Sequence, residues 1–268
     1  MKNKLFKELK GFCAKSSSEM RIHMAYIKIN YNSTILQMPI VLDVLLPQGH
    51  GGYKVLYLLH GAGGDHSSWI LKSRIADYVE GANLAVVMPS GNNKFYVNNI
   101  YGKDYFSFIT EELIDVCQKW FNISKNFIDR YIAGMSMGGY GAYYAALKKP
   151  SFYHCAFSYS GLLNIIERYE KPQGLEMFSV FGTKQCLLDN SYDLYQLINN
   201  KSIKNVDNST QFMTFCGLQD ARRHMSEEFA DKAKKAGYTI FLREEEGGHN
   251  WEYWDKCIKQ TIAYIAKE

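Results

Sequence analysis

Residues 131–146 read YIAGMSMGGYGAYYAA and place Gly-Met-Ser-Met-Gly between an apolar run and an alanine-rich stretch. The apolar run, residues 127–133, predicts a buried strand, and residues 137–147 predict the helix that follows it. A serine at such a strand-turn-helix junction has a strained backbone, and side chains two residues to either side of it would collide. Gly134 and Gly138 remove those side chains. The segment therefore predicts a nucleophile elbow with Ser136 at its tip.

The Gly-x-Ser-x-Gly pattern is a weak signal on its own, because a chain with 21 glycines can contain it by chance. The alternative interpretation is a glycine-rich turn of purely structural use. The strand before the serine and the helix after it favour the elbow. The start of that helix would direct backbone N–H groups toward a developing negative charge.

Apolar runs alternate with helical patterns along most of the chain, which is typical of an α/β fold with a mostly parallel central sheet and helices on both faces. Residues 20–47 differ and predict an antiparallel N-terminal hairpin at the sheet edge, with its turn at residues 30–33. The further predicted strands are residues 55–59, 84–88, 155–159, 212–216 and 238–242. The further predicted helices are residues 69–79, 109–120, 226–236 and the segment after residue 250.

The length of 268 residues suits one α/β domain with a large core. We expect a tail over residues 1–18 and a single domain over residues 19–268. Residues 161–209 show no clean period and predict a cap-like insertion over a pocket. Three acids in this insertion are interpreted as solvated carboxylates, namely Asp189, Asp193 and Asp207.

The composition excludes several classes of protein. Charged residues make up 22% of the chain, the net charge is +4, and no Lys/Arg block predicts a nucleic-acid or membrane partner. No apolar run reaches the roughly 18 residues of a membrane span, and the N-terminus lacks the apolar region of a secretory signal. The six cysteines are scattered and form no CxxC pair, so we expect free thiols, a cytoplasmic location, and no metal or other cofactor.

An oxyanion hole needs backbone N–H donors from two segments, one following the nucleophile and one from an early strand-to-helix loop. The sequence His60-Gly61-Ala62-Gly63-Gly64 follows the predicted strand 55–59. Ala62 and Met137 are therefore the predicted donors. The alternative is a flexible turn in which His60 only packs.

A serine hydroxyl needs a base to take its proton, and triads on this kind of fold run serine, acid, histidine along the chain. His249 follows two glycines between the last strand and the last helix and is preferred over His224, which we interpret as a surface residue. Asp220 follows the predicted strand 212–216 and is the predicted acid. Glu246 belongs to a solvated Glu244-Glu245-Glu246 run, although it is close to His249 in the sequence.

Five motifs in this order are LLHGAGGDHSSW, VVMPSG, YIAGMSMGGYGA, FCGLQD and GGHNWEYW. Together they resemble the esterase D-like family of putative esterases, which has the α/β-hydrolase fold and includes bacterial tributyrin or acetyl esterases and S-formylglutathione hydrolase. The resemblance covers about residues 20–265. It implies that Ser136, Asp220 and His249 are catalytic and that Ala62 and Met137 form the oxyanion hole. The run Ala221-Arg222-Arg223 departs from the apolar or aromatic residues expected there and could reshape the pocket.

Residues 92–101 combine aromatic and amide side chains just past a predicted strand end, where ligands of open α/β sheets bind. This loop is either a rim that stacks on a sugar or phenolic group, or an ordinary polar loop. Trp251 and Trp254 are expected mainly as packing for the last helix. The predicted substrate-binding residues are His60, Gly61, Trp69, Tyr101, Tyr140 and Trp251.

The predicted function is a serine carboxylic-ester hydrolase that cleaves short acyl esters through an acyl-enzyme, with acetyl or feruloyl groups on oligosaccharides among the candidate substrates. The alternatives are a thioesterase like S-formylglutathione hydrolase, an acyltransferase on the same scaffold, and a non-catalytic binding protein. The expected partner is a small ester or an acylated oligosaccharide, and a homo-oligomer is compatible with the sequence.

Overall fold

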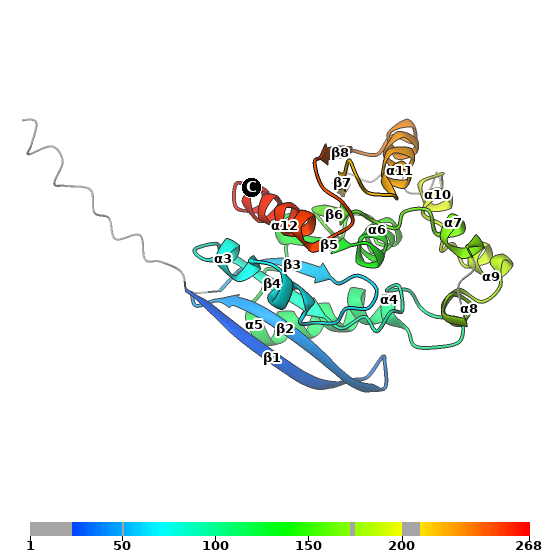
Figure 1. The fold of residues 1–268 in the computed structure, drawn as a ribbon. Helices are drawn as coiled ribbons and strands as arrows, with labels where there is room; N and C mark the ends of the chain where they lie inside the picture. Colours follow the sequence, from blue (N-terminus) through cyan, green and yellow to red (C-terminus); the bar gives the residue numbers. More distant parts are fainter. Residues whose placement is uncertain (1–22, 50, 172–174, 200–209) are drawn as a thin grey trace, which may run out of the picture.

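The computed structural model describes residues 23–49, 51–171, 175–199 and 210–268. The predicted tail over residues 1–18, Cys13 and Asp207 lie outside these ranges. The described strands form one eight-stranded sheet in the order β1-β2-β4-β3-β5-β6-β7-β8 (Figure 1). Their bounds are β1 Met24–Ser33, β2 Met38–Pro47, β3 Lys54–Leu59, β4 Leu84–Pro89, β5 Arg130–Met135, β6 Cys155–Tyr159, β7 Gln211–Gly217 and β8 Ile240–Glu245.

Strands β3 to β8 pair in parallel, while β2 pairs antiparallel with both β1 and β4. The predicted hairpin therefore occupies one edge of a mostly parallel sheet, as in the predicted α/β-hydrolase fold. Residues 127–129 of the predicted strand 127–133 form a 3₁₀ turn, η2 (Phe127–Asp129), and the last strand starts two residues later than predicted.

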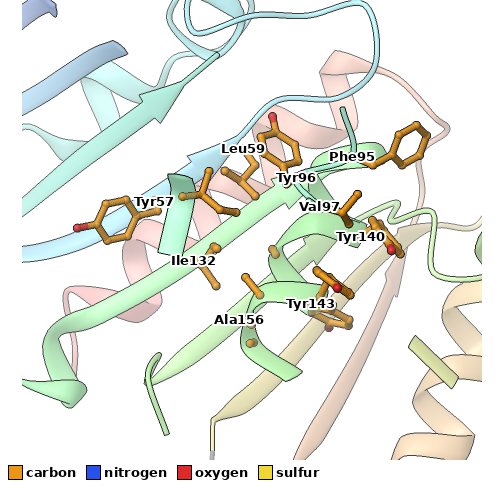
Figure 2. Packing of buried hydrophobic residues seen from close by; sticks show 14 of the residues in the cluster. Tyr57, Leu59, Phe95, Tyr96, Val97, Ile132, Tyr140, Tyr143 and Ala156 are labelled. Carbon is orange, nitrogen blue, oxygen red and sulfur yellow. The ribbon is translucent and has the colours of Figure 1, made fainter. Parts of the chain in front are cut away.

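Helices cover both faces of the sheet because its central strands are apolar on both sides. In β3, Leu56 and Leu58 face one core, while Val55, Tyr57 and Leu59 face the other. The first core is closed by α2 (Ser68–Lys72), α3 (Ile75–Val79) and α12 (Trp251–Ile265), and the second by α5 (Leu113–Phe121), α6 (Met137–Lys148) and α11 (Arg223–Lys235). Figure 2 shows the second core, with Tyr140 and Tyr143 of α6 beside the sheet.

The turn of the N-terminal hairpin lies four residues later than predicted. Residues 30–33 continue β1, and the chain turns at residues 34–37, where Gln37 has φ of 50°. The carboxylate of Glu112 accepts hydrogen bonds from the hydroxyl of Ser33 and the backbone N–H groups of Thr34 and Ile35. A side chain distant in the sequence thus accepts the hydrogen bonds of the turn residues, and the turn contains no glycine.

The predicted helix 109–120 begins earlier, with α4 (Tyr105–Ser107) and a π-helical turn, η1 (Phe108–Glu112), before α5. The buried residues of α5 are Leu113, Ile114, Cys117 and Phe121, whereas Trp120 is 51% exposed. The ring of Trp120 packs edge-on against Tyr31.

The segment after β6 contains four short helices, α7 (Ile165–Glu170), α8 (Leu175–Phe181), α9 (Lys184–Asp189) and α10 (Leu194–Asn199). They gather beyond one end of the sheet (Figure 1). Asp193 is buried rather than solvated, burial raises the pKa of its carboxyl, and one carboxylate oxygen accepts a bond from the N–H of Tyr195. Within the described ranges, no helix combines the length and apolar character needed to cross a membrane.

Candidate active site

The elbow around Ser136 is as tight as the sequence predicts. Ser136 joins β5 to α6 with φ of 52° and ψ of −114°, a conformation that L residues rarely adopt. A Cβ on Gly134 would lie 2.3 Å from the Gly138 carbonyl, and one on Gly138 would lie 2.6 Å from the Leu59 carbonyl oxygen. The backbone N–H of Ser136 donates to the carbonyl of Tyr159 at 2.9 Å, which fixes the elbow against β6.

His249 lies in the loop between β8 and α12, immediately before the capping residue of that helix. Asn250 accepts a bond from the N–H of Tyr253 through its side chain, so the chain direction at His249 is fixed. The His249 Nε2 atom lies 3.1 Å from the Ser136 Oγ atom. The ring of Trp254 packs edge-on against the imidazole, with centroids 5.0 Å apart.

Asp220 holds the other side of the imidazole. Its Oδ2 atom lies 2.9 Å from the Nδ1 atom of His249, and its Oδ1 atom accepts from the N–H of Arg222 at 2.9 Å. Burial alone would raise the pKa of this carboxyl, but the bonds from His249 and from the Arg222 backbone outweigh it and lower the pKa. The carboxylate is therefore ionised at neutral pH.

The loops that carry Asp220 and His249 touch each other. A Cβ on Gly217 would lie 2.1 Å from the carbonyl oxygen of Gly247, so the two backbones approach as closely as they can. Glu246 is bound to the side chain of Gln219 at 2.6 Å and does not contact the imidazole.

The loop after β3 lies directly against the start of α6. The same contact that requires glycine at position 138 brings this loop to the elbow, and Ala62 and Ser136 line one cavity. In the described part of the chain, the backbone N–H groups of Ala62 and Met137 donate to no protein acceptor. Both amides are thus available to an oxygen atom bound beside Ser136.

His60 supports this loop from beneath and does not reach the cavity. It is 1% exposed, its Nε2 accepts from the N–H of Gly91 at 2.7 Å, and its Nδ1 bonds the carbonyl of Gly61. The hydroxyl of Tyr96 donates to the His60 carbonyl at 3.0 Å. His60, one of the predicted substrate-binding residues, therefore lies outside the cavity lining with both ring nitrogens bonded within the fold.

A cavity of about 490 Å³ opens above Ser136. Two of the predicted substrate-binding residues, Gly61 and Trp251, line it, and so does Trp254, which we expected mainly as core packing. The full lining is Gly61, Ala62, Gly63, Gly64, Ser68, Lys72, Met135, Ser136, Arg222, His249, Asn250, Trp251 and Trp254.

Three other predicted substrate contacts lie away from this cavity. Trp69 is fully buried and donates its indole N–H to the carbonyl of Leu59. Tyr140 is fully buried and donates its hydroxyl to the Tyr192 carbonyl. Tyr101 is exposed and stacks on Phe178 instead. None of these three side chains belongs to the cavity lining, because packing of the cores and of α8 holds them elsewhere.

The loop 92–101 also stays out of the cavity lining. Its contribution is indirect, since the side chain of Asn93 accepts from the backbone N–H of Gly63 at 2.7 Å. None of the lining residues comes from residues 161–199 either, so this segment stands beside the cavity described above.

The sequence analysis did not predict that Arg222 would lie in the cavity, in contact with Ser136 and His249. Its Nη1 atom lies 3.1 Å from the Oγ of Ser136 and 2.9 Å from the Nε2 of His249. The departure from the family pattern at residues 221–223 was the available signal. Arg223, its neighbour, points elsewhere and pairs with Glu244 and Glu227.

An imidazole between a serine hydroxyl and a buried carboxylate, at the carboxyl ends of a parallel sheet, defines the arrangement of a serine hydrolase. The family model described as "Putative esterase" matches residues 33–265, and the chain belongs to this family. It is a carboxylic ester hydrolase of the serine esterase class.

Three proteins illustrate the similarity. An acetyl esterase from Caldicellulosiruptor saccharolyticus is 27% identical over 264 residues, covering 91% of this chain and 99% of the relative. The solved structure of the fluorophosphonate-binding serine hydrolase FphF from Staphylococcus aureus has a TM-score of 0.85 and 27% identity, covering 92% of this chain and 100% of that one. The S-formylglutathione hydrolase FrmB from the same organism has a TM-score of 0.82 and 28% identity, covering 91% and 99%.

Proposed function

We propose that this esterase hydrolyses short acyl esters with Ser136 as nucleophile, His249 as base and Asp220 as the residue that orients the imidazole. The observation that carries the proposal is the position of the imidazole, with Nε2 3.1 Å from the serine hydroxyl and Nδ1 2.9 Å from the carboxylate. An ionised Asp220 accepts a hydrogen bond from the Nδ1–H of His249, which leaves the unprotonated Nε2 within reach of the serine hydroxyl.

In the first half-reaction, the Ser136 oxygen forms a bond to the ester carbonyl carbon while its proton passes to Nε2 of His249. The carbonyl oxygen becomes an oxyanion, and the N–H groups of Ala62 and Met137 stabilise it. The bond to the alcohol oxygen then breaks, and that oxygen takes the proton from the imidazolium. This leaves an acyl group on Ser136 and a neutral His249.

In the second half-reaction, water gives a proton to His249 and attacks the acyl carbon. The bond to the serine oxygen breaks, Ser136 recovers its proton, and the carboxylic acid leaves. None of these steps uses a metal or a cofactor.

The cavity of about 490 Å³ has room for a short acyl group beside Ser136. Trp251 and Trp254 form an apolar wall, and the elbow closes the floor. The similarity to an acetyl esterase supports acetyl esters as substrates, and the similarity to an S-formylglutathione hydrolase supports formyl thioesters as the second candidate. Acetylated or feruloylated oligosaccharides remain a proposal that rests on the sequence.

The first experiment replaces Ser136 by Ala and measures hydrolysis of p-nitrophenyl acetate. We expect turnover to fall by at least about 10⁴-fold, as when a catalytic nucleophile is removed. Ser179→Ala is a matched control, because that hydroxyl bonds a carbonyl within α8 outside the cavity. Unchanged turnover in Ser136→Ala would contradict the proposal.

A substrate panel then resolves the acyl and leaving groups. It compares p-nitrophenyl esters of increasing chain length, S-formylglutathione, and acetylated and feruloylated xylo-oligosaccharides. We expect kcat/KM to fall as the acyl chain lengthens beyond the cavity. Adding an alcohol or sugar acceptor tests for acyl transfer, since a transferase would form acceptor-dependent ester in place of free acid.

The domain limits and the location are also proposals. We infer one α/β-hydrolase domain over residues 19–268, with residues 161–209 as an insertion. All five cysteines in the described part of the chain are free, and four of them are buried, which supports a reducing compartment such as the cytoplasm.

A further inference from the structure

The guanidinium of Arg222 lies against Nε2 of His249, the atom that must accept the proton of Ser136. A guanidinium only donates hydrogen bonds, so at 2.9 Å it donates into the lone pair of His249 Nε2. The same lone pair has to accept the proton of Ser136 during attack. Arg222 therefore competes with the catalytic hydroxyl for one acceptor.

The charge of Arg222 acts in the same direction. Proton transfer turns His249 into an imidazolium, and a cation in hydrogen-bond contact disfavours that charge. The Asp220 carboxylate, bound to Nδ1 of the same imidazole, favours the imidazolium and opposes this effect. A neutral ester leaves this arrangement unchanged.

No carboxylate in the described part of the chain pairs with the Arg222 guanidinium. None of the residues that line the cavity is acidic, whereas Arg222 and Lys72 are both cationic. The adjacent Arg223 has two carboxylate partners, Glu227 and Glu244, so acids are available to this loop but do not face the cavity.

A second guanidinium, that of Arg168, interacts electrostatically with Arg222. Arg168 on α7 has a buried Nη1 atom with no hydrogen-bond partner among the described residues. Burial lowers the pKa of Arg168, and the charge of Arg222 lowers it further, while the exposed Glu176 opposes the effect. Arg222 thus lies beside Ser136 with a second cation near it and with no carboxylate partner in the described ranges, an arrangement that an anion would complete.

We propose that Arg222 determines specificity by selecting esters that carry a carboxylate close to the scissile carbonyl. This inference rests on the proposed function and adds the chemical class of its substrate. The substrate carboxylate binds the guanidinium, neutralises it and draws it away from Nε2, which frees that lone pair for the proton of Ser136. A neutral ester lacks this effect and reacts slowly.

The test measures kcat/KM on two pairs of nearly isosteric esters. Monoethyl succinate against ethyl levulinate places the carboxylate on the acyl side, and 3-acetoxybenzoate against 3-acetoxybenzamide places it on the leaving-group side. We expect the wild-type protein to favour the carboxylate in at least one pair by about tenfold or more, because charge-assisted bidentate contacts are among the stronger polar contacts. The pair that shows this preference identifies whether the recognised carboxylate lies on the acyl side or on the leaving-group side of the ester.

Arg222→Gln should abolish this preference and at the same time raise kcat on the neutral esters, by about threefold or more. Arg222→Lys keeps the charge without the planar fork and should retain part of the preference. Arg223→Gln is the matched control and should behave like wild type. A merely structural role for Arg222 would lower activity on all four esters together.

Turnover of all four esters by the wild type without a carboxylate preference would overturn this inference and leave the esterase proposal intact. So would Arg222→Gln with unchanged ratios. If Arg222→Gln does not fold, the wild-type ratios alone still decide, together with inhibition by succinate against succinamide. Failure of the wild type to cleave any ester would overturn both proposals.

Discussion

The Nε2 atom of the buried His60 accepts a hydrogen bond from the backbone N–H of Gly91 at 2.7 Å. This bond joins the loop after β3 to the loop after β4. Since the first loop carries Ala62, the imidazole holds one of the two amides that we propose for the oxyanion hole. His60 is thus a positioning residue.

His60→Phe keeps an aromatic ring of similar shape but removes the acceptor for Gly91. We expect kcat on p-nitrophenyl acetate to fall about tenfold to a hundredfold with little change in KM, because a displaced donor weakens transition-state binding. The free energy of unfolding should fall by about 1–3 kcal/mol, the cost of an unpaired buried N–H. His224→Phe is the control, since His224 is exposed and pairs with Glu167. Wild-type kcat in His60→Phe would contradict the positioning role.

Burial lowers the pKa of His60 in the folded protein. Between that lowered value and the ordinary histidine pKa of about 6.5, the unfolded chain binds a proton that the folded chain does not. Stability from this group is therefore complete above about pH 6.5 and is lost as the pH falls through the folded pKa. Urea unfolding of wild type and His60→Phe across about pH 4.5–8 should show a stability difference that shrinks on acidification. A difference that grows instead would contradict the assignment.

Gly138→Ala tests the contact between α6 and the loop after β3. The added Cβ would lie 2.6 Å from the carbonyl oxygen of Leu59, so the helix must move away from the loop. We expect a loss of about 2 kcal/mol or more in stability and at least a tenfold loss in kcat. Gly49→Ala is the control, because its Cβ would meet nothing nearer than 3.7 Å, on Tyr53. Activity and stability like wild type in Gly138→Ala would show that the elbow is looser than described.

Asp220→Asn retains the shape of the side chain and removes its charge. An amide can donate to Nδ1 and so stabilise the wrong tautomer of His249, which leaves Nε2 without a lone pair. We expect kcat to fall by about 10⁴-fold with KM little changed. Glu246→Gln should keep nearly full activity, because Glu246 binds Gln219 and not the imidazole. If Glu246→Gln instead gave the larger loss, the acid would be misassigned.

The elbow, the parallel strands and the meeting of Ser136, Asp220 and His249 were predictable because each depends on local signals. The glycines around Ser136 indicate that two backbone segments approach closely, and the apolar runs indicate buried strands. The hairpin turn was not predictable in the same way. The strand pattern continues through residues 30–33, and the turn that follows is satisfied by Glu112, which is 79 residues away from Ser33.

The substrate contacts were less predictable than the fold. Trp69 and Tyr140 follow the two glycine-rich motifs closely, yet both are 0% exposed, because the cores on the two faces of the sheet take them. Arg222 lines the cavity, whereas Arg223 pairs with Glu244 outside it. Which of the two side chains faces the cavity depends on the orientation of α11. Neighbouring residues in a sequence do not reveal such a choice.

The central claim is that the Ser136 hydroxyl is activated by His249 for attack on a carbonyl. Labelling with a fluorophosphonate probe, followed by mass spectrometry of the digested protein, tests it most directly. We predict a single adduct on the peptide that contains Ser136, absent in Ser136→Ala and formed far more slowly in His249→Ala. Ester hydrolysis by a wild-type protein whose Ser136 stays unlabelled, or an adduct on another residue, would contradict the account.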